Sequence, residues 1–127
     1  MGKIRVAIAD DSPAFAAAAA DYVARLPGYV VAGTVQSAGQ AVALVRSTLP
    51  HVLLLDLGAA PARGLDVVRS VKALPASPAV VALTLFHSPE AAAAARHAGA
   101  DALVGKEAFV SGLTQTLALL FPARVAA

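Results

Sequence analysis

The amino-acid sequence predicts an α/β fold in which a parallel sheet of five strands carries helices on both faces. Five short runs rich in Val, Ile and Leu recur along the 127 residues, with helical stretches between them. The runs are continuous rather than alternating, which is typical of strands buried on both faces. Because crossovers between parallel strands are right-handed, few topologies remain. We predict the flavodoxin-like, doubly wound (βα)5 arrangement with strand order 2-1-3-4-5.

The expected strands are the five apolar runs themselves. They cover residues 4–9, 30–35, 52–55, 80–84 and 102–104. In a sheet of this kind, ligands bind at the carboxyl ends of the strands, beside the point where strands 1 and 3 meet. The residues that follow these runs are therefore the first candidates for a functional site.

Proline, glycine and capping residues set the expected helix boundaries. Pro13 opens the first helix, Ser37 is the expected N-cap of the second, and Gly99 ends the fourth. The helices are expected over residues 13–26, 37–49, 64–74, 89–98 and 107–121. Apolar positions on the helix faces are assigned to the core, namely Phe15, Tyr22, Leu26, Leu44, Leu113 and Leu117.

Composition bounds the class of protein. Hydrophobic residues make up 58% and charged residues 14%, which is enough apolar material for a core, and residues 1–127 are expected to form one domain. The chain has no Cys, and no apolar run approaches the ~18 residues of a membrane span. We expect a cytoplasmic protein that binds no membrane. The ten basic residues are scattered, so the net charge of +2 predicts a solvated surface and no nucleic-acid site.

Polar residues follow four of the predicted strands at the edge where ligands are expected. Asp10 and Asp11 end strand 1, Asp56 ends strand 3, Thr84 ends strand 4, and Lys106 follows strand 5. Two carboxylates ~4 Å apart at an effective dielectric of ~20 repel by roughly 4 kcal/mol, so positive charge must compensate them. Lys106 supplies one charge, and oxygen-only ligands favour Mg²⁺ for the remainder. A carboxylate beside Mg²⁺, an ammonium and a hydroxyl is suited to accepting a phosphoryl group.

With these residues in order, the sequence resembles the receiver domains of bacterial two-component response regulators over nearly its full length. The matching segments are residues 8–13, 50–57, 64–66, 83–84 and 99–104, together with Lys106. The resemblance implies that Asp56 is the phosphorylated residue, that Thr84 is the switch hydroxyl and that Lys106 pairs with the phosphoryl group. It implies a Mg²⁺ site formed by Asp10, Asp11, Asp56 and the backbone carbonyl of Gly58.

The resemblance also implies partners. The phosphoryl donor would be a histidine kinase or a phosphotransfer protein, and the domain would act as a switch rather than as an enzyme. Phosphorylation would remodel the face formed by helix 4, strand 5 and helix 5. Residues 110–121 contain no charged residue, which predicts a homodimer or output-domain contact through helix 5. Glu107 after the lysine is typical of regulators similar to the nitrate-response type.

Some positions depart from the pattern of the family. Leu103 stands where these domains usually carry an aromatic residue, and Leu85 and Phe86 follow Thr84 where a small residue is usual. One alternative is therefore a receiver-like interaction module with vestigial phosphorylation. A second is a phosphatase of the haloacid-dehalogenase type, although that class needs Asp-x-Asp where this chain has Asp10-Asp11. A third is a flavin or nucleotide binder, but no glycine-rich loop follows strand 1.

Overall fold

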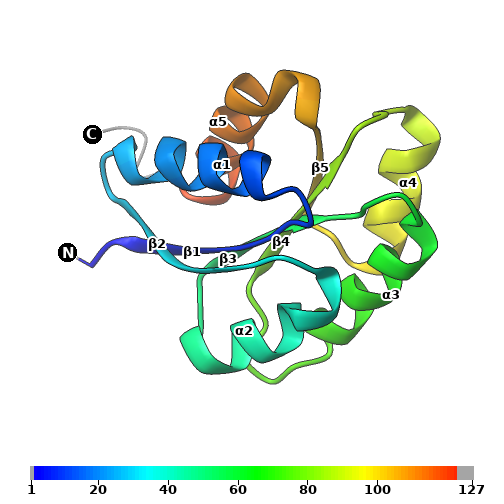
Figure 1. The fold of residues 1–127 in the computed structure, drawn as a ribbon, viewed down its shortest axis with the longest axis horizontal. Helices are drawn as coiled ribbons and strands as arrows, with labels where there is room; N and C mark the ends of the chain where they lie inside the picture. Colours follow the sequence, from blue (N-terminus) through cyan, green and yellow to red (C-terminus); the bar gives the residue numbers. More distant parts are fainter. Residues whose placement is uncertain (1, 123–127) are drawn as a thin grey trace.

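The computed structural model describes residues 2–122 and shows a parallel five-stranded sheet in the order β2-β1-β3-β4-β5 (Figure 1). The predicted flavodoxin-like strand order is therefore confirmed. Every strand lies within one residue of its predicted boundaries. The strands are β1 (Ile4–Ala9), β2 (Tyr29–Val35), β3 (Val52–Asp56), β4 (Ala79–Thr84) and β5 (Ala102–Gly105).

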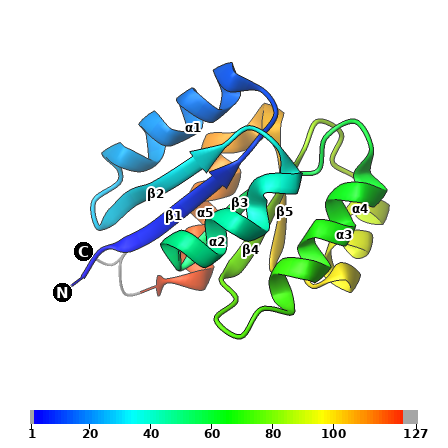
Figure 2. The same cartoon turned by 60° about the horizontal axis from the view of Figure 1, so that its bottom comes forward.

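In the described part of the chain, five α-helices cover the two faces of the sheet (Figure 2). Helices α1 (Pro13–Arg25) and α5 (Phe109–Leu120) pack on one face, and α2 (Ala41–Thr48), α3 (Pro61–Lys72) and α4 (Pro89–Ala98) pack on the other. Gly99 ends α4 in the left-handed conformation with φ 111°, as its place in the sequence predicts.

The central strand β3 explains why the apolar runs are continuous. Leu53 and Leu55 point into the core beneath α2, α3 and α4, whereas Val52 and Leu54 point into the core beneath α1 and α5. All four are fully buried. A strand covered on both faces needs apolar side chains at successive positions, and its polar terminus is then the natural place for a functional group.

Two predicted helix starts are wrong. Helix α3 begins at Pro61 rather than at Gly64, because proline suits the first helical turn, where its missing N–H costs nothing. Ser37 does not cap α2. Its hydroxyl donates instead to Oε1 of Gln40 at 3.1 Å, and a 3-10 turn over Ala38–Gln40 comes before the helix.

The start of the last helix also differs from the prediction. A 3-10 turn, Lys106–Ala108, lies between β5 and α5, so the α-helix begins at Phe109 and not at position 107. This tighter turn keeps Lys106 at the carboxyl end of β5 rather than on the outer surface of a helix.

None of the helices formed by residues 2–122 has the length and apolar character that a membrane span requires.

Candidate functional site

Three acids meet at the carboxyl edge of the sheet, where β1 and β3 lie side by side. Asp10 and Asp11 follow β1 directly, and Asp56 is the last residue of β3. The register pairs Ala9 with Leu55, which brings the ends of the two strands to the same level. One carboxylate oxygen from each acid lies within 4.8 Å of the others. Asp10 and Asp56 are buried, whereas Asp11 is exposed.

Lys106 bridges the two buried acids. Its Nζ lies 2.9 Å from Oδ2 of Asp10 and 3.3 Å from Oδ1 of Asp56. The same ammonium lies 4.4 Å from the centroid of the Phe15 ring, which holds it by a cation–π contact. One positive charge therefore faces three carboxylates, so the site has an excess of negative charge.

Backbone amides fix the orientation of both buried acids. The N–H of Ser12 donates to Oδ1 of Asp10 at 2.9 Å, and the N–H of Gly58 donates to Oδ1 of Asp56 at 3.1 Å. Gly58 has φ 71°, which favours glycine, and a Cβ at this position would lie 3.9 Å from Oδ2 of Asp11. The loop after β3 therefore packs closely against the acids.

The excess negative charge affects the pKa of the Asp11 carboxyl. A hydrogen bond shared with Asp56, together with the negative charge of Asp56, raises the pKa of Asp11 above its usual value. Burial and Asp10 act in the same direction, and Lys106 opposes them. A cation bound among these oxygens would relieve the same repulsion.

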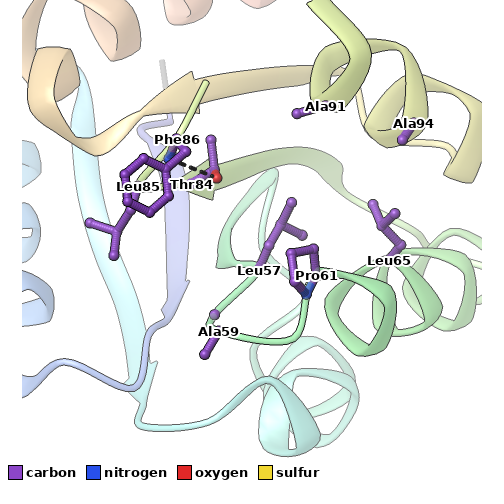
Figure 3. Close-up of a pocket in the computed structure, with 10 residues that line it drawn as sticks. Leu57, Ala59, Pro61, Leu65, Thr84, Leu85, Phe86, Ala91 and Ala94 are labelled. Atoms are coloured by element: carbon purple, nitrogen blue, oxygen red, sulfur yellow. Dashed lines mark hydrogen bonds between the residues drawn. The ribbon is translucent and has the colours of Figure 1, made fainter. Parts of the chain in front are cut away.

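Two hollows of about 400 Å³ each lie side by side at this edge. The acidic hollow is lined by Asp11, Ser12, Phe15, Asp56, Gly58, Ala59, Leu85 and Lys106. The apolar hollow includes Leu57, Pro61, Leu65, Phe86, Ala91 and Ala94 in its lining (Figure 3). Gly58, Ala59 and Leu85 line both, so they form the wall between the two.

Thr84 lies at the same edge of the sheet but lines the apolar hollow (Figure 3). It pairs with Gly105 on β5, while its neighbour Leu83 pairs with Asp56 on β3. Its hydroxyl oxygen accepts a hydrogen bond from the N–H of Phe86 at 3.3 Å. The structure thus brings Asp10, Asp11, Asp56, Gly58 and Lys106 into one cluster and places Thr84 beside it.

Residues 6–118, which make up most of the chain, match the family model of the response regulator receiver domain. The chain belongs to the receiver domain family. Receiver domains are signalling switches of two-component response regulators that bind Mg²⁺ at an acidic pocket and pair with histidine kinases and DNA-binding output domains. No match was found among curated protein sequences.

The solved structures that are similar to this receiver domain include regulators of the LuxR and NarL types. A LuxR-family two-component response regulator from Aurantimonas sp. shares 25% identity at a TM-score of 0.85, with 97% of this chain and 88% of that chain covered. The signal receiver domain of NarL from Mycobacterium tuberculosis shares 22% identity at a TM-score of 0.82, with both chains fully covered. RcsB from Salmonella typhimurium shares 22% identity at a TM-score of 0.84, with 97% of this chain and 62% of that chain covered.

Two residues of the acidic hollow in this receiver domain were not predicted as site residues. Phe15 is assigned to the core by its helical position, but its ring is only partly buried and contacts the ammonium of Lys106. Ser12 both caps α1, accepting from the N–H of Phe15, and donates its own N–H to Asp10. Its position directly after the acid pair, before Pro13, is the sequence signal that identifies it.

Proposed function

We propose that this receiver domain accepts a phosphoryl group on Asp56 in the presence of Mg²⁺. The observation that supports the proposal is the cluster itself. Three carboxylate oxygens lie within 4.8 Å of one another, and Lys106 reaches Asp10 and Asp56 at the same time. Asp56 opens onto a hollow large enough to admit a phosphoryl group.

The residues present fit Mg²⁺. Among the described residues, the lining of the acidic hollow offers carboxylate oxygens and contains no His or Cys. Hard oxygen donors of this kind suit Mg²⁺, which keeps several water ligands and uses few protein carboxylates. Asp10, Asp11, Asp56 and the carbonyl of Gly58 would hold the ion. When bound, it would neutralise the carboxylates and the incoming phosphoryl oxygens.

The chemistry at Asp56 is a phosphoryl transfer. A carboxylate oxygen of Asp56 attacks phosphorus, an O–P bond forms, and the N–P bond to a phosphohistidine of the donor breaks. Lys106 already lies 3.3 Å from Oδ1 of Asp56, so its ammonium can follow the negative charge as it moves onto the phosphoryl group. Gly58 holds the same carboxylate through its N–H.

Thr84 is the group proposed to report the phosphorylated state. Among the described residues, its hydroxyl hydrogen bonds only to the N–H of Phe86, which leaves its proton available for a phosphoryl oxygen. A shift of this hydroxyl toward Asp56 would move the loop between β4 and α4, and with it the face formed by α4, β5 and α5.

The proposal is tested by intact-mass measurement after incubation with acetyl phosphate and Mg²⁺. We expect the mass of one phosphoryl group on the wild-type chain, none on Asp56→Asn, and none when EDTA removes Mg²⁺. Asp66→Asn is a matched control, because Asp66 is an exposed acid of α3 that pairs only with Arg69 in the described structure. Labelling of Asp56→Asn to the wild-type extent would refute the assignment of Asp56.

We further propose that the partner is a histidine kinase or phosphotransfer protein and that α5 forms a contact with a second copy or with an output domain. Val110 and Leu119 of α5 are large apolar side chains exposed to solvent, which supports such a contact. Sedimentation with and without beryllofluoride tests self-association. A strict monomer at high concentration in both states would exclude the homodimer.

A further inference from the structure

Phe86 has an unusual position for an aromatic residue. The residue is 83% exposed, although it stands at the rim of the apolar hollow (Figure 3). An aromatic side chain in water lacks the hydrophobic stabilisation that burial would give it. The apolar hollow beside Phe86 could bury the ring. The ring and the hollow are therefore complementary parts of one local arrangement.

The hollow exists because α4 presents small residues toward it. Ala91 and Ala94 line it from α4, while Leu57 lines it from the loop directly after β3 and Leu65 from α3 (Figure 3). Its volume of about 400 Å³ is sufficient to accept a phenyl ring. Apart from Thr84, the side chains that line it are apolar, so the hollow suits a hydrocarbon group.

Phe86 is tied to the phosphorylation site by one hydrogen bond. Its N–H donates to the hydroxyl oxygen of Thr84 at 3.3 Å. When that hydroxyl moves toward a phosphoryl group on Asp56, the bond either breaks or draws the backbone of Phe86 with it. Either event would allow the loop that carries Phe86 to change conformation, and Phe86 already lines the rim of the hollow.

We propose that the apolar hollow between β4, α3 and α4 is the receptor for the ring of Phe86, which lies in solvent in the unphosphorylated state and enters the hollow in the phosphorylated state. This inference rests on the proposed phosphorylation of Asp56. Ring burial then contributes to the stability of the phosphorylated conformation, and α4 gains a new contact with its preceding loop. A change at Asp56 is thereby converted into a change at α4.

The chain is well suited to a ¹⁹F NMR test because it contains four Phe residues. Protein labelled with 4-fluorophenylalanine gives at most four ring signals, and Phe86→Leu identifies the signal of Phe86. The signal is compared between H₂O and D₂O before and after addition of Mg²⁺ and beryllofluoride. We expect a large solvent isotope shift in the free protein and its loss in the loaded protein.

The fluorines of beryllofluoride give their own signal, which reports independently whether the acidic hollow is occupied. If no bound beryllofluoride signal forms, the proposed function itself fails and this inference fails with it. If beryllofluoride binds and the Phe86 signal keeps its solvent isotope shift, the proposed function stands and only the inference is overturned.

Ala94→Leu tests the hollow directly by filling it from α4 with a good helix former. We expect this variant to bind beryllofluoride with the Phe86 signal still exposed, and about tenfold more weakly than the wild type. Phe86→Ala should show a similar loss of affinity. Leu49→Ala is the matched control, because Leu49 is also a large exposed apolar residue (59%) but lies at the end of α2, outside the hollow, and the affinity of this variant should be unchanged. Burial of Phe86 in Ala94→Leu, or equal affinities in all variants, would overturn the proposal.

Discussion

Asp11→Asn should make the protein more stable in metal-free buffer, although it removes a residue of the proposed Mg²⁺ site. The three acids share a small volume with one ammonium, and the negative charge of Asp56 raises the pKa of Asp11. An amide of the same shape removes the repulsion and can still hydrogen bond to Asp56. Charge repulsion, and not a loss of packing, should decide the sign of the effect.

The size of the effect follows from the distances. Carboxylate oxygens up to 4.8 Å apart repel by about 3.5 kcal/mol per pair at an effective dielectric of ~20. Because Asp11 is exposed, solvent screens most of this energy, and Lys106 offsets part of the remainder. We therefore expect the free energy of unfolding to rise by about 1 kcal/mol, equivalent to a Tm increase of about 4 °C.

Both pH and Mg²⁺ should change the difference in unfolding free energy between Asp11→Asn and the wild type. A raised pKa means that the folded protein holds the Asp11 proton more tightly than the unfolded chain, in which an Asp titrates near 3.8. The wild type should lose stability as pH rises from 3.8 through the raised value, and Asp11→Asn should lose less. Mg²⁺ at ~100 times its Kd adds ~2.7 kcal/mol to the wild type and should add less to the variant.

The assay is urea unfolding at several pH values, in EDTA and in Mg²⁺. Asp21→Asn is the control, since Asp21 is an exposed acid on α1 that pairs with Arg25 away from the site. Its unfolding should respond to Mg²⁺ as the wild type does. A lower stability of Asp11→Asn than of the wild type in EDTA at neutral pH would refute the reasoning from charge repulsion.

Three further predictions concern stability and use urea unfolding followed by circular dichroism. Gly64→Ala should lower the free energy of unfolding by about 2 kcal/mol, because its Cβ would lie 2.8 Å from Cα of Leu57; an unchanged midpoint would contradict this. Leu49→Asn should raise it by about 0.5–1 kcal/mol, since Leu49 is 59% exposed and strained at φ 48°; a loss of stability would argue against backbone strain. Asp101→Ala should lower it by about 1–3 kcal/mol, because Oδ2 accepts from the N–H of Val80 at 2.8 Å, and a neutral effect would show that water replaces this acceptor.

The sequence alone predicted much of this fold because strands buried on both faces leave a local signal. Each apolar run could be read from consecutive residues, and each strand lies within one residue of its expected bounds. The Asp10-Asp11 pair and Asp56 could be placed at one edge for the same reason, since parallel strands end together. Helix starts were harder, because a capping hydroxyl such as that of Ser37 can bond to a neighbouring side chain instead of the backbone.

Only the tertiary structure determined the contacts and hollows that several helices, strands and loops form together. The approach of Lys106 to two buried acids depends on the turn after β5, and its contact with Phe15 depends on how α1 lies against that turn. The hollow beside Phe86 forms only where the loop after β3 packs together with β4, α3 and α4 around small residues. Propensity and periodicity act between neighbours in the chain, whereas the direction of a side chain and the space beside it depend on residues far apart in sequence. The sequence alone therefore determines where the strands and the acids of the site lie along the chain. Only tertiary packing determines which side chains face the acids and where hollows remain between the elements.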